Sequence, residues 1–230
     1  MESASGDVID GPSRPRGIPT STSTTERVVE ALRNFVIEGS IAPGTRISEQ
    51  TFSSALDVSR NTLRVAFRVL AHERLLVHEM NRGVFVRQLT ARDVDSIYQF
   101  RSIVEVAAVR DTTRHSGQSI RGARRAVDEG LAALQAEDWR GLGTANMHFH
   151  RAIASLSGNE RIDAAMSQLL AELRLAFHVM TPLRSFHEPY LEDNLRICSL
   201  VEQGDGNVAA AVLTEYLARA RLQLIAAYER

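Results

Sequence analysis

The spacing of apolar residues predicts three helices in the first part of the chain. Between residues 24 and 39, large apolar side chains recur every three or four positions, which is the period of an amphipathic helix. Similar spacing predicts two shorter helices over residues 48–56 and 59–72. Only Asp57 and Val58 separate these two helices, and so tight a connection is typical of a helix-turn-helix motif.

After the third helix, short runs of branched and aromatic residues replace the helical spacing. Residues 75–78 and 84–86 form two such runs, and Asn81, Arg82 and Gly83 lie between them. Runs of this kind on either side of a glycine turn predict a β-hairpin. Three helices followed by a hairpin indicate a winged helix-turn-helix domain.

From Thr90 onward the helical spacing returns and no strand pattern follows. Thr90 is a good helix N-cap, and we expect Pro189 in or beside a connection because proline interrupts helical hydrogen bonding. The pattern predicts an all-α bundle of about six helices, near residues 91–114, 118–136, 138–156, 159–180, 185–203 and 207–229.

These elements give a fold class that is mostly α, with a tail and two domains. Residues 1–22 are rich in Gly, Ser, Thr and Pro and poor in large apolar residues, so we expect a disordered tail. Residues 23–88 form the predicted winged helix-turn-helix domain. Residues 89–230 form the predicted helical domain.

Composition narrows the class of protein further. The 230 residues are 44% apolar and 24% charged, close to globular averages, and no apolar run is long enough to cross a membrane. The first residues lack the apolar stretch of a secretory signal, and the single Cys198 cannot form an internal disulfide. We therefore expect a cytoplasmic protein with no membrane partner.

The net charge of −1 hides a local excess of arginine. The chain contains no lysine, and residues 60–87 hold six arginines against two glutamates. An arginine stripe by itself is usually a solvated helix face. Here it coincides with the predicted helix-turn-helix, and this coincidence favours double-stranded DNA as a partner.

Arg60 and Arg64 are the residues that we expect to read base edges. They lie near the N-terminal end of the predicted third helix, which is the end that enters the major groove, and a guanidinium group matches guanine O6 and N7. Arg68, one turn deeper, is expected to contact a phosphate or to pair with Glu73. The other candidate DNA contacts lie beside the helix start and at the hairpin tip, and they are Ser59, Asn61, Thr62, Arg82 and Gly83.

Several segments resemble known bacterial regulators. Residues 36–44, 58–64 and 83–86 resemble the GntR family of transcription regulators. Residues 100–105 and 157–159, with the pairs Phe149-His150 and Gly204-Asp205, resemble the helical effector-binding domain of the FadR-like subfamily in its FCD form. The resemblance implies a homodimer that binds operator DNA and a small molecule.

The same resemblance implies a divalent metal, held in many members by one Asp and three His. Position by position, the Asp falls on Asn146, one His is kept as His150, and the other two fall on Asn194 and Tyr216. Amide and phenol oxygens bind divalent metals less well than carboxylate and imidazole, so we expect no metal cofactor such as zinc. The remaining possible ligands are His148, which points away from His150 on the same helix, and His178 and His187.

At the four metal-ligand positions this chain therefore carries hydrogen-bonding side chains, and the family resemblance implies that they surround one cavity. Together with Arg101, a cation that binds carboxylates bidentately, these groups predict a metal-free pocket for a small carboxylate effector. The alternative is that Arg101 pairs with Glu105 one turn on, and that the polar groups form a satisfied interior network. The predicted effector-binding residues are Arg101, Asn146, His150, Asn194 and Tyr216.

The sequence therefore predicts a cytoplasmic, homodimeric repressor that is not an enzyme. Two alternatives stay open. The helical domain could serve in dimerisation only, or the chain could be a metal-dependent helical hydrolase with a DNA-docking module. No catalytic motif or phosphate-binding loop supports the hydrolase.

Overall fold

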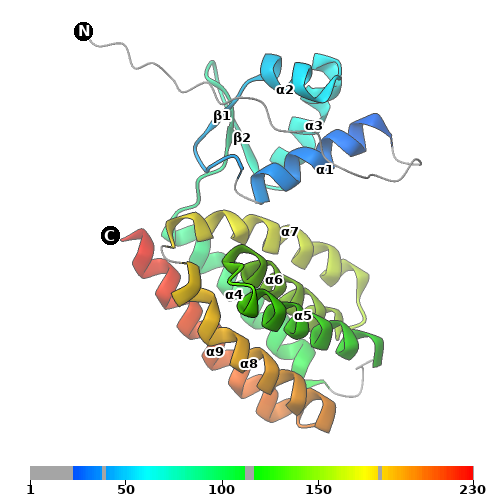
Figure 1. Ribbon diagram of the computed structural model, residues 1–230, viewed down its shortest axis with the longest axis vertical. Coiled ribbons are helices and arrows are strands. Elements are labelled where there is room, and N and C mark those ends of the chain that lie inside the picture. Colours follow the sequence, from blue (N-terminus) through cyan, green and yellow to red (C-terminus); the bar gives the residue numbers. More distant parts are fainter. Residues whose placement is uncertain (1–22, 38–39, 112–116, 181–182, 230) are drawn as a thin grey trace. The chain divides into compact units, whose positions relative to one another are not determined.

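The structure is a computed structural model that describes residues 23–37, 40–111, 117–180 and 183–229. The chain divides into two units, the first ending at Arg87 and the second beginning at Gln88. The fold class is mostly α, with a winged helix-turn-helix in the first unit and a helical bundle in the second (Figure 1). The tail predicted over residues 1–22 lies outside the described residues.

The first unit packs two amphipathic helices against each other beside a small sheet. Leu32 and Val36 of the first helix and Leu63 and Leu70 of the third are fully buried, which removes their apolar surface from water. In chain order, the elements are α1 (Thr24–Ile37), β1 (Arg46–Ile47), α2 (Glu49–Leu56), α3 (Arg60–His72), β2 (Leu76–Glu79) and β3 (Gly83–Val86).

The sheet contains one strand that the sequence pattern missed. Its strand order is β1-β3-β2, and both pairs are antiparallel. Phe85 of β3 pairs with Val77 on one side and with Arg46 on the other. Because β1 has only two residues, it is too short to show the alternation by which strands are recognised.

The turn between α2 and α3 is held by a cap at each end. Asp57 adopts the left-handed conformation (φ 53°) and its backbone N–H bonds to the carbonyls of Ser53 and Ser54. Ser59 then caps α3, because its hydroxyl accepts a hydrogen bond from the backbone N–H of Thr62 at 3.1 Å. These two caps define the start of α3, and the start of α3 carries the predicted base-reading residues.

The second unit is a bundle in which α6 packs against α4, α5, α7 and α8. Phe149 and Ile153 of α6 are buried in its centre. Thr90 and Asp93 form a reciprocal capping box at the start of α4, as expected. The helices are α4 (Ala91–Arg110), α5 (Gly117–Gln135), α6 (Trp139–Ser155), α7 (Glu160–Ala176), the 3-10 turn η2 (Phe177–Val179), α8 (Leu183–Gln203) and α9 (Gly206–Tyr228).

The expected position of Pro189 was wrong, because this residue lies inside α8 and not in a connection. Proline lacks the N–H that would bond to the carbonyl of the fourth preceding residue. Phe186, Tyr190 and Leu191 on either side are buried, and their packing offsets the missing bond. Among the described residues, no helix is long and apolar enough to span a lipid bilayer.

Candidate functional site

Helix α3 presents a basic face to solvent. Leu63, Ala66, Phe67 and Leu70 are buried on its inner side. Arg60, Arg64 and Arg68 are all exposed on the outside, as their four-residue spacing predicts. The helix thus packs on one face and offers guanidinium groups on the other.

Arg64 is held by a carboxylate of the neighbouring helix. Its Nε lies 3.0 Å from both carboxylate oxygens of Glu49, and its Nη2 lies 3.0 Å from Oε2 of the same residue. Arg60 and Arg68 make no ion pair with other residues in the described part of the chain. The donors of Arg64 are therefore occupied by Glu49, whereas Arg60 has no ion-pair partner among the described residues.

The pairing of Arg68 with Glu73 that the sequence left open was wrong. Glu73 is instead bound by Arg33 of α1, whose Nε and Nη2 donate to the two carboxylate oxygens at 2.9 and 2.6 Å. This pair joins the first and third helices at their partly buried edge. Arg68 remains exposed.

The wing turns at Asn81 and Gly83, which both have positive φ (63° and 113°). A side chain at Gly83 would be strained by this φ, and its Cβ would lie 3.2 Å from Nε of Arg46, so Gly83 shapes the turn. Arg82 is exposed at the tip, where it pairs with Glu79 and lies 5.4 Å above the ring of Phe85. Ser59 and Thr62 bond to each other at 2.8 Å within the N-cap, and Asn61 is exposed beside them.

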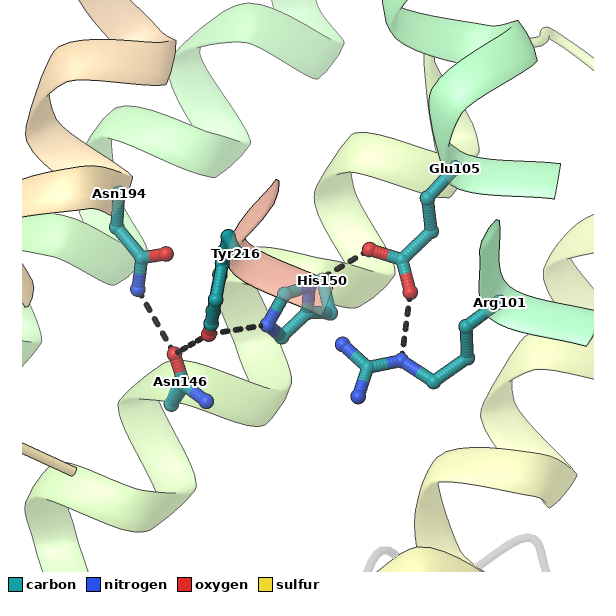
Figure 2. A network of polar contacts seen from close by, with 6 residues as sticks. All are labelled: Arg101, Glu105, Asn146, His150, Asn194 and Tyr216. Atoms are coloured by element: carbon teal, nitrogen blue, oxygen red, sulfur yellow. Dashed lines mark hydrogen bonds and ion pairs between the residues drawn. The ribbon is translucent and has the colours of Figure 1, made fainter. Parts of the chain in front are cut away.

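In the second unit, five side chains that the sequence singled out form one continuous buried network with Glu105 (Figure 2). Arg101 and Glu105 come from α4, Asn146 and His150 from α6, Asn194 from α8 and Tyr216 from α9. The four helices therefore meet at this point. Each of the six residues is at most 8% exposed.

The network begins at Arg101, whose Nε donates to Glu105 at 2.7 Å. The other carboxylate oxygen of Glu105 accepts a hydrogen bond from Nδ1–H of His150 at 2.6 Å. Nε2 of His150 shares a hydrogen bond with the hydroxyl of Tyr216 at 2.7 Å. Glu105, which the sequence suggested only as a partner of Arg101, is thus the residue that joins Arg101 to the rest.

The network continues through an amide pair. The Tyr216 hydroxyl, whose single proton serves either Nε2 of His150 or Oδ1 of Asn146, lies 3.0 Å from that Oδ1, and Nδ2 of Asn194 lies 2.8 Å from the same oxygen. Two atoms of the network have no hydrogen-bond partner among the described residues, namely Nη2 of Arg101 and Oδ1 of Asn194. The interior network that the sequence left open as the alternative to a pocket is therefore present, but two of its atoms have no partner among the described residues.

Burial and charge act against each other within this network. Burial by itself would raise the pKa of Glu105, but the charge of Arg101 and the hydrogen bonds from Arg101 and His150 outweigh burial and lower this pKa. Burial lowers the pKa of His150, and the positive charge of Arg101 lowers it further. Burial also raises the pKa of Tyr216 well above its usual value. Glu105 is therefore the anion of the network and Arg101 its cation.

This donor set does not fit a divalent metal. Both ring nitrogens of His150 are already engaged, one by Glu105 and the other by Tyr216. Asn146 and Asn194 offer amide oxygens, which are weaker ligands than carboxylate or imidazole. Across the described ranges, no group of three or more His, Cys, Asp or Glu is arranged to hold a metal ion.

The other histidines considered as ligands lie elsewhere. His148 bonds to Glu129 at 2.7 Å and lines a hollow of about 450 Å³ on the surface between α5, α6 and α7. His187 is buried between the rings of Phe177 and Phe186. Neither histidine bonds to the network in the described part of the bundle.

Comparison with known proteins identifies both units. The description "Bacterial regulatory proteins, gntR family" matches residues 24–86, and "FCD domain" matches residues 96–219. The chain therefore belongs to the GntR family of bacterial transcriptional regulators, in the group that carries an FCD domain. Relatives of this chain are by name transcriptional regulators.

Individual relatives agree with this assignment. A crystal structure of a GntR transcriptional regulator from Rhodococcus sp. RHA1 is 43% identical, covers 90% of this chain and 100% of that chain, and superposes with a TM-score of 0.85. The Nta operon transcriptional regulator of Aminobacter aminovorans is 29% identical over 74% of this chain and 80% of its own. The gluconate operon transcriptional repressor of Bacillus subtilis is 35% identical, but the match covers only 37% of this chain and 35% of the relative.

Proposed function

We propose that this chain is a homodimeric repressor that binds a two-fold operator and responds to a small acidic metabolite in its helical domain. The observation that carries the proposal is the exposed pair Arg60 and Arg64 at the capped start of α3. Side chains at the N-terminal end of a recognition helix reach base edges in the major groove. Repression is supported by a relative that is by name a transcriptional repressor.

The DNA contacts divide into two kinds. Arg60 and Arg64 read guanine edges, because their planar donor pairs match O6 and N7. The other contacts position the domain on the backbone, where the positive end of α3 favours phosphate. Arg68 makes such a contact, Ser59, Asn61 and Thr62 bond to phosphates or base edges beside it, and Arg82 next to Gly83 at the hairpin tip enters the minor groove.

Two copies of the domain would read two half-sites about one helical turn apart, since the symmetry of the operator mirrors that of a dimer. The helical domain supplies the effector site, which consists of Arg101, Asn146, His150, Asn194 and Tyr216, and Glu105 links them. An effector changes operator affinity only by binding the DNA-competent and incompetent arrangements differently. Because chromosomal operators lie in the cytoplasm, the protein acts there.

The test begins with an operator selected from random duplexes by the wild-type chain. Fluorescence anisotropy then measures the affinity of Arg60→Ala and Arg64→Ala for that operator and for a scrambled duplex at fixed salt. Each variant is expected to lose about 1–3 kcal/mol on the operator and to relax specificity at one base position. The scrambled duplex should be affected less.

Two variants serve as controls. Arg196→Ala removes an exposed arginine of α8 in the other unit and should leave both affinities unchanged. Arg68→Ala removes a phosphate contact, so it should lower the affinity for the operator and for the scrambled duplex to the same extent. Equal losses on operator and scrambled DNA for Arg60→Ala and Arg64→Ala would exclude base reading by these residues.

A further inference from the structure

Helix α3 carries an apolar side chain near the middle of its outward face. The inward direction is given by the four buried residues of the helix, which are Leu63, Ala66, Phe67 and Leu70. Because successive residues of an α-helix are rotated by about 100°, Asn61, Val65 and Arg68 lie within about 30° of the opposite direction. Val65 is therefore on the surface that approaches DNA in the proposed function.

The folded domain itself gains little from a valine at this position. Val65 is 36% exposed and lies on the side of the helix away from the core, so its methyl groups remain available to a partner. Valine is also a poorer helix former than alanine or arginine, because its branched side chain loses rotamer freedom in a helix. Neither core packing nor helix stability therefore accounts for this residue.

Polar side chains surround Val65 on the outward face. Asn61 lies one turn before it and Arg68 one turn after it, and both are exposed. The guanidinium of Arg64 is held toward α2, where its Nε lies 3.0 Å from both carboxylate oxygens of Glu49. These neighbours offer hydrogen bonds, whereas Val65 offers only methyl groups. The group that Val65 contacts on a partner must therefore be apolar as well.

The major groove offers an apolar group of this kind, which is the C5-methyl group of thymine. Val65 lies in the second turn of α3, close to the N-terminal end that contacts base edges. We propose that Val65 contacts the C5-methyl group of a thymine and thereby selects thymine over cytosine at one position of each operator half-site. This inference rests on the proposed function, since it adds an apolar contact to the same interface.

Replacing thymine by deoxyuridine tests the contact, because this change removes the C5-methyl group and leaves the base pair and the O4 acceptor in place. The selected operator is synthesised with a single deoxyuridine at each thymine position in turn. Fluorescence anisotropy then measures the affinity of the full wild-type chain for each duplex at fixed salt. At one thymine of a half-site, binding is expected to weaken about fourfold, as for the loss of one buried methyl group.

Variants assign the methyl contact to Val65. Val65→Ser removes the apolar branches, so it should bind the thymine and deoxyuridine duplexes with equal affinity at the sensitive position. Val69→Ser is the matched control, because Val69 is 38% exposed on the same helix but lies one turn farther from the end that enters the groove. This control should keep the preference for thymine. Each comparison uses one variant with two duplexes, so a change in the folded fraction cancels.

The outcomes separate this inference from the proposed function. If the operator contains no thymine that is sensitive to deoxyuridine, the inference is overturned, whereas specific losses in Arg60→Ala and Arg64→Ala keep the proposed function. A preference that survives in Val65→Ser, or that is lost equally in Val69→Ser, overturns the assignment to Val65. If the chain selects no operator from random duplexes, the proposed function fails and the inference fails with it.

Discussion

At the scale of single residues, Glu105 joins Arg101 to His150. The sequence presented Arg101 as either a ligand-binding cation or a partner of Glu105, and the structure shows the ion pair with one guanidinium nitrogen left over. Glu105 also accepts from His150, and so it neutralises Arg101 while fixing the orientation of the imidazole. The two interpretations of Arg101 are therefore compatible.

Replacing Tyr216 by Phe should destabilise the helical domain by about 1–3 kcal/mol. The hydroxyl contacts both Nε2 of His150 and Oδ1 of Asn146, and its removal leaves buried polar groups with fewer partners. Urea unfolding followed by fluorescence of Trp139, the single tryptophan, reports on this domain. Tyr228→Phe near the C-terminal end of α9 is the control, and an equal loss in both variants would contradict the role of the Tyr216 hydroxyl.

Replacing Glu49 by Gln should strengthen DNA binding without changing the stability of the first unit. The Glu49 carboxylate occupies the donors of Arg64 and adds a negative charge beside the surface that approaches phosphates. The pair is exposed, so it contributes little to folding. Anisotropy titrations with the selected operator measure the effect, and weaker binding would show instead that Glu49 holds Arg64 in its productive orientation.

At the scale of elements, α6 determines how closely the helices of the bundle approach. It packs against four other helices and carries Gly143 at a point where α8 comes very near. A Cβ at position 143 would lie 2.9 Å from Nε2 of His187 and 3.0 Å from Nη1 of Arg174. The absence of a side chain at this position therefore allows His187 to be buried.

Gly143→Ala should destabilise the bundle by about 1–3 kcal/mol, because the buried ring of His187 must move to admit a methyl group. Gly122→Ala in α5 is a matched control, since the nearest atom to its Cβ is the Cβ of Ala152 at 3.5 Å. That change should stabilise the domain by about 0.5–1 kcal/mol, because alanine favours the helix over glycine. Unfolding followed by Trp139 fluorescence compares the two, and equal effects would contradict the close approach.

At the scale of the whole molecule, the two units carry different kinds of site. The first unit places its charges at the surface, where an exposed arginine is available to a large partner. The second unit buries the ion pair of Arg101 and Glu105 in the centre of a bundle, in addition to the ion pairs at its surface. One consequence is that stability depends on pH through the second unit, because burial lowers the pKa of His187 to about 3.

The sign of this pH dependence follows from proton uptake. Between pH 6.5 and 3 the unfolded chain binds a proton at His187 and the folded chain does not, so the stability present above pH 6.5 is lost as the pH falls. At pH 5 the loss from this residue is about 2 kcal/mol relative to pH 7.5. Unfolding at both pH values should show a smaller difference in His187→Leu than in the wild type, whereas His78→Gln, at an exposed histidine, should leave the difference unchanged. An unchanged difference in His187→Leu would assign the effect to other groups.

Features that depend on neighbours along the chain could be predicted from the sequence. Apolar spacing predicted the helices, the short turn at Asp57 and Val58 predicted the helix-turn-helix, and the spacing of Arg60 and Arg64 predicted their common exposed face. The two-residue strand β1 and the helical position of Pro189 escaped it, because pairing and packing with distant residues hold them in place.

Which polar groups contact each other depends instead on how the helices pack. Arg101 and Glu105 are four positions apart and their pairing was visible in advance, but Glu105 and His150 are 45 positions apart, and His150 and Tyr216 are 66. The family resemblance named Asn146, His150, Asn194 and Tyr216, but not the bonds between them or the two atoms left unpaired. Hydrogen bonds across a bundle depend on how the helices pack in depth and rotation, and periodicity along one helix does not contain that information.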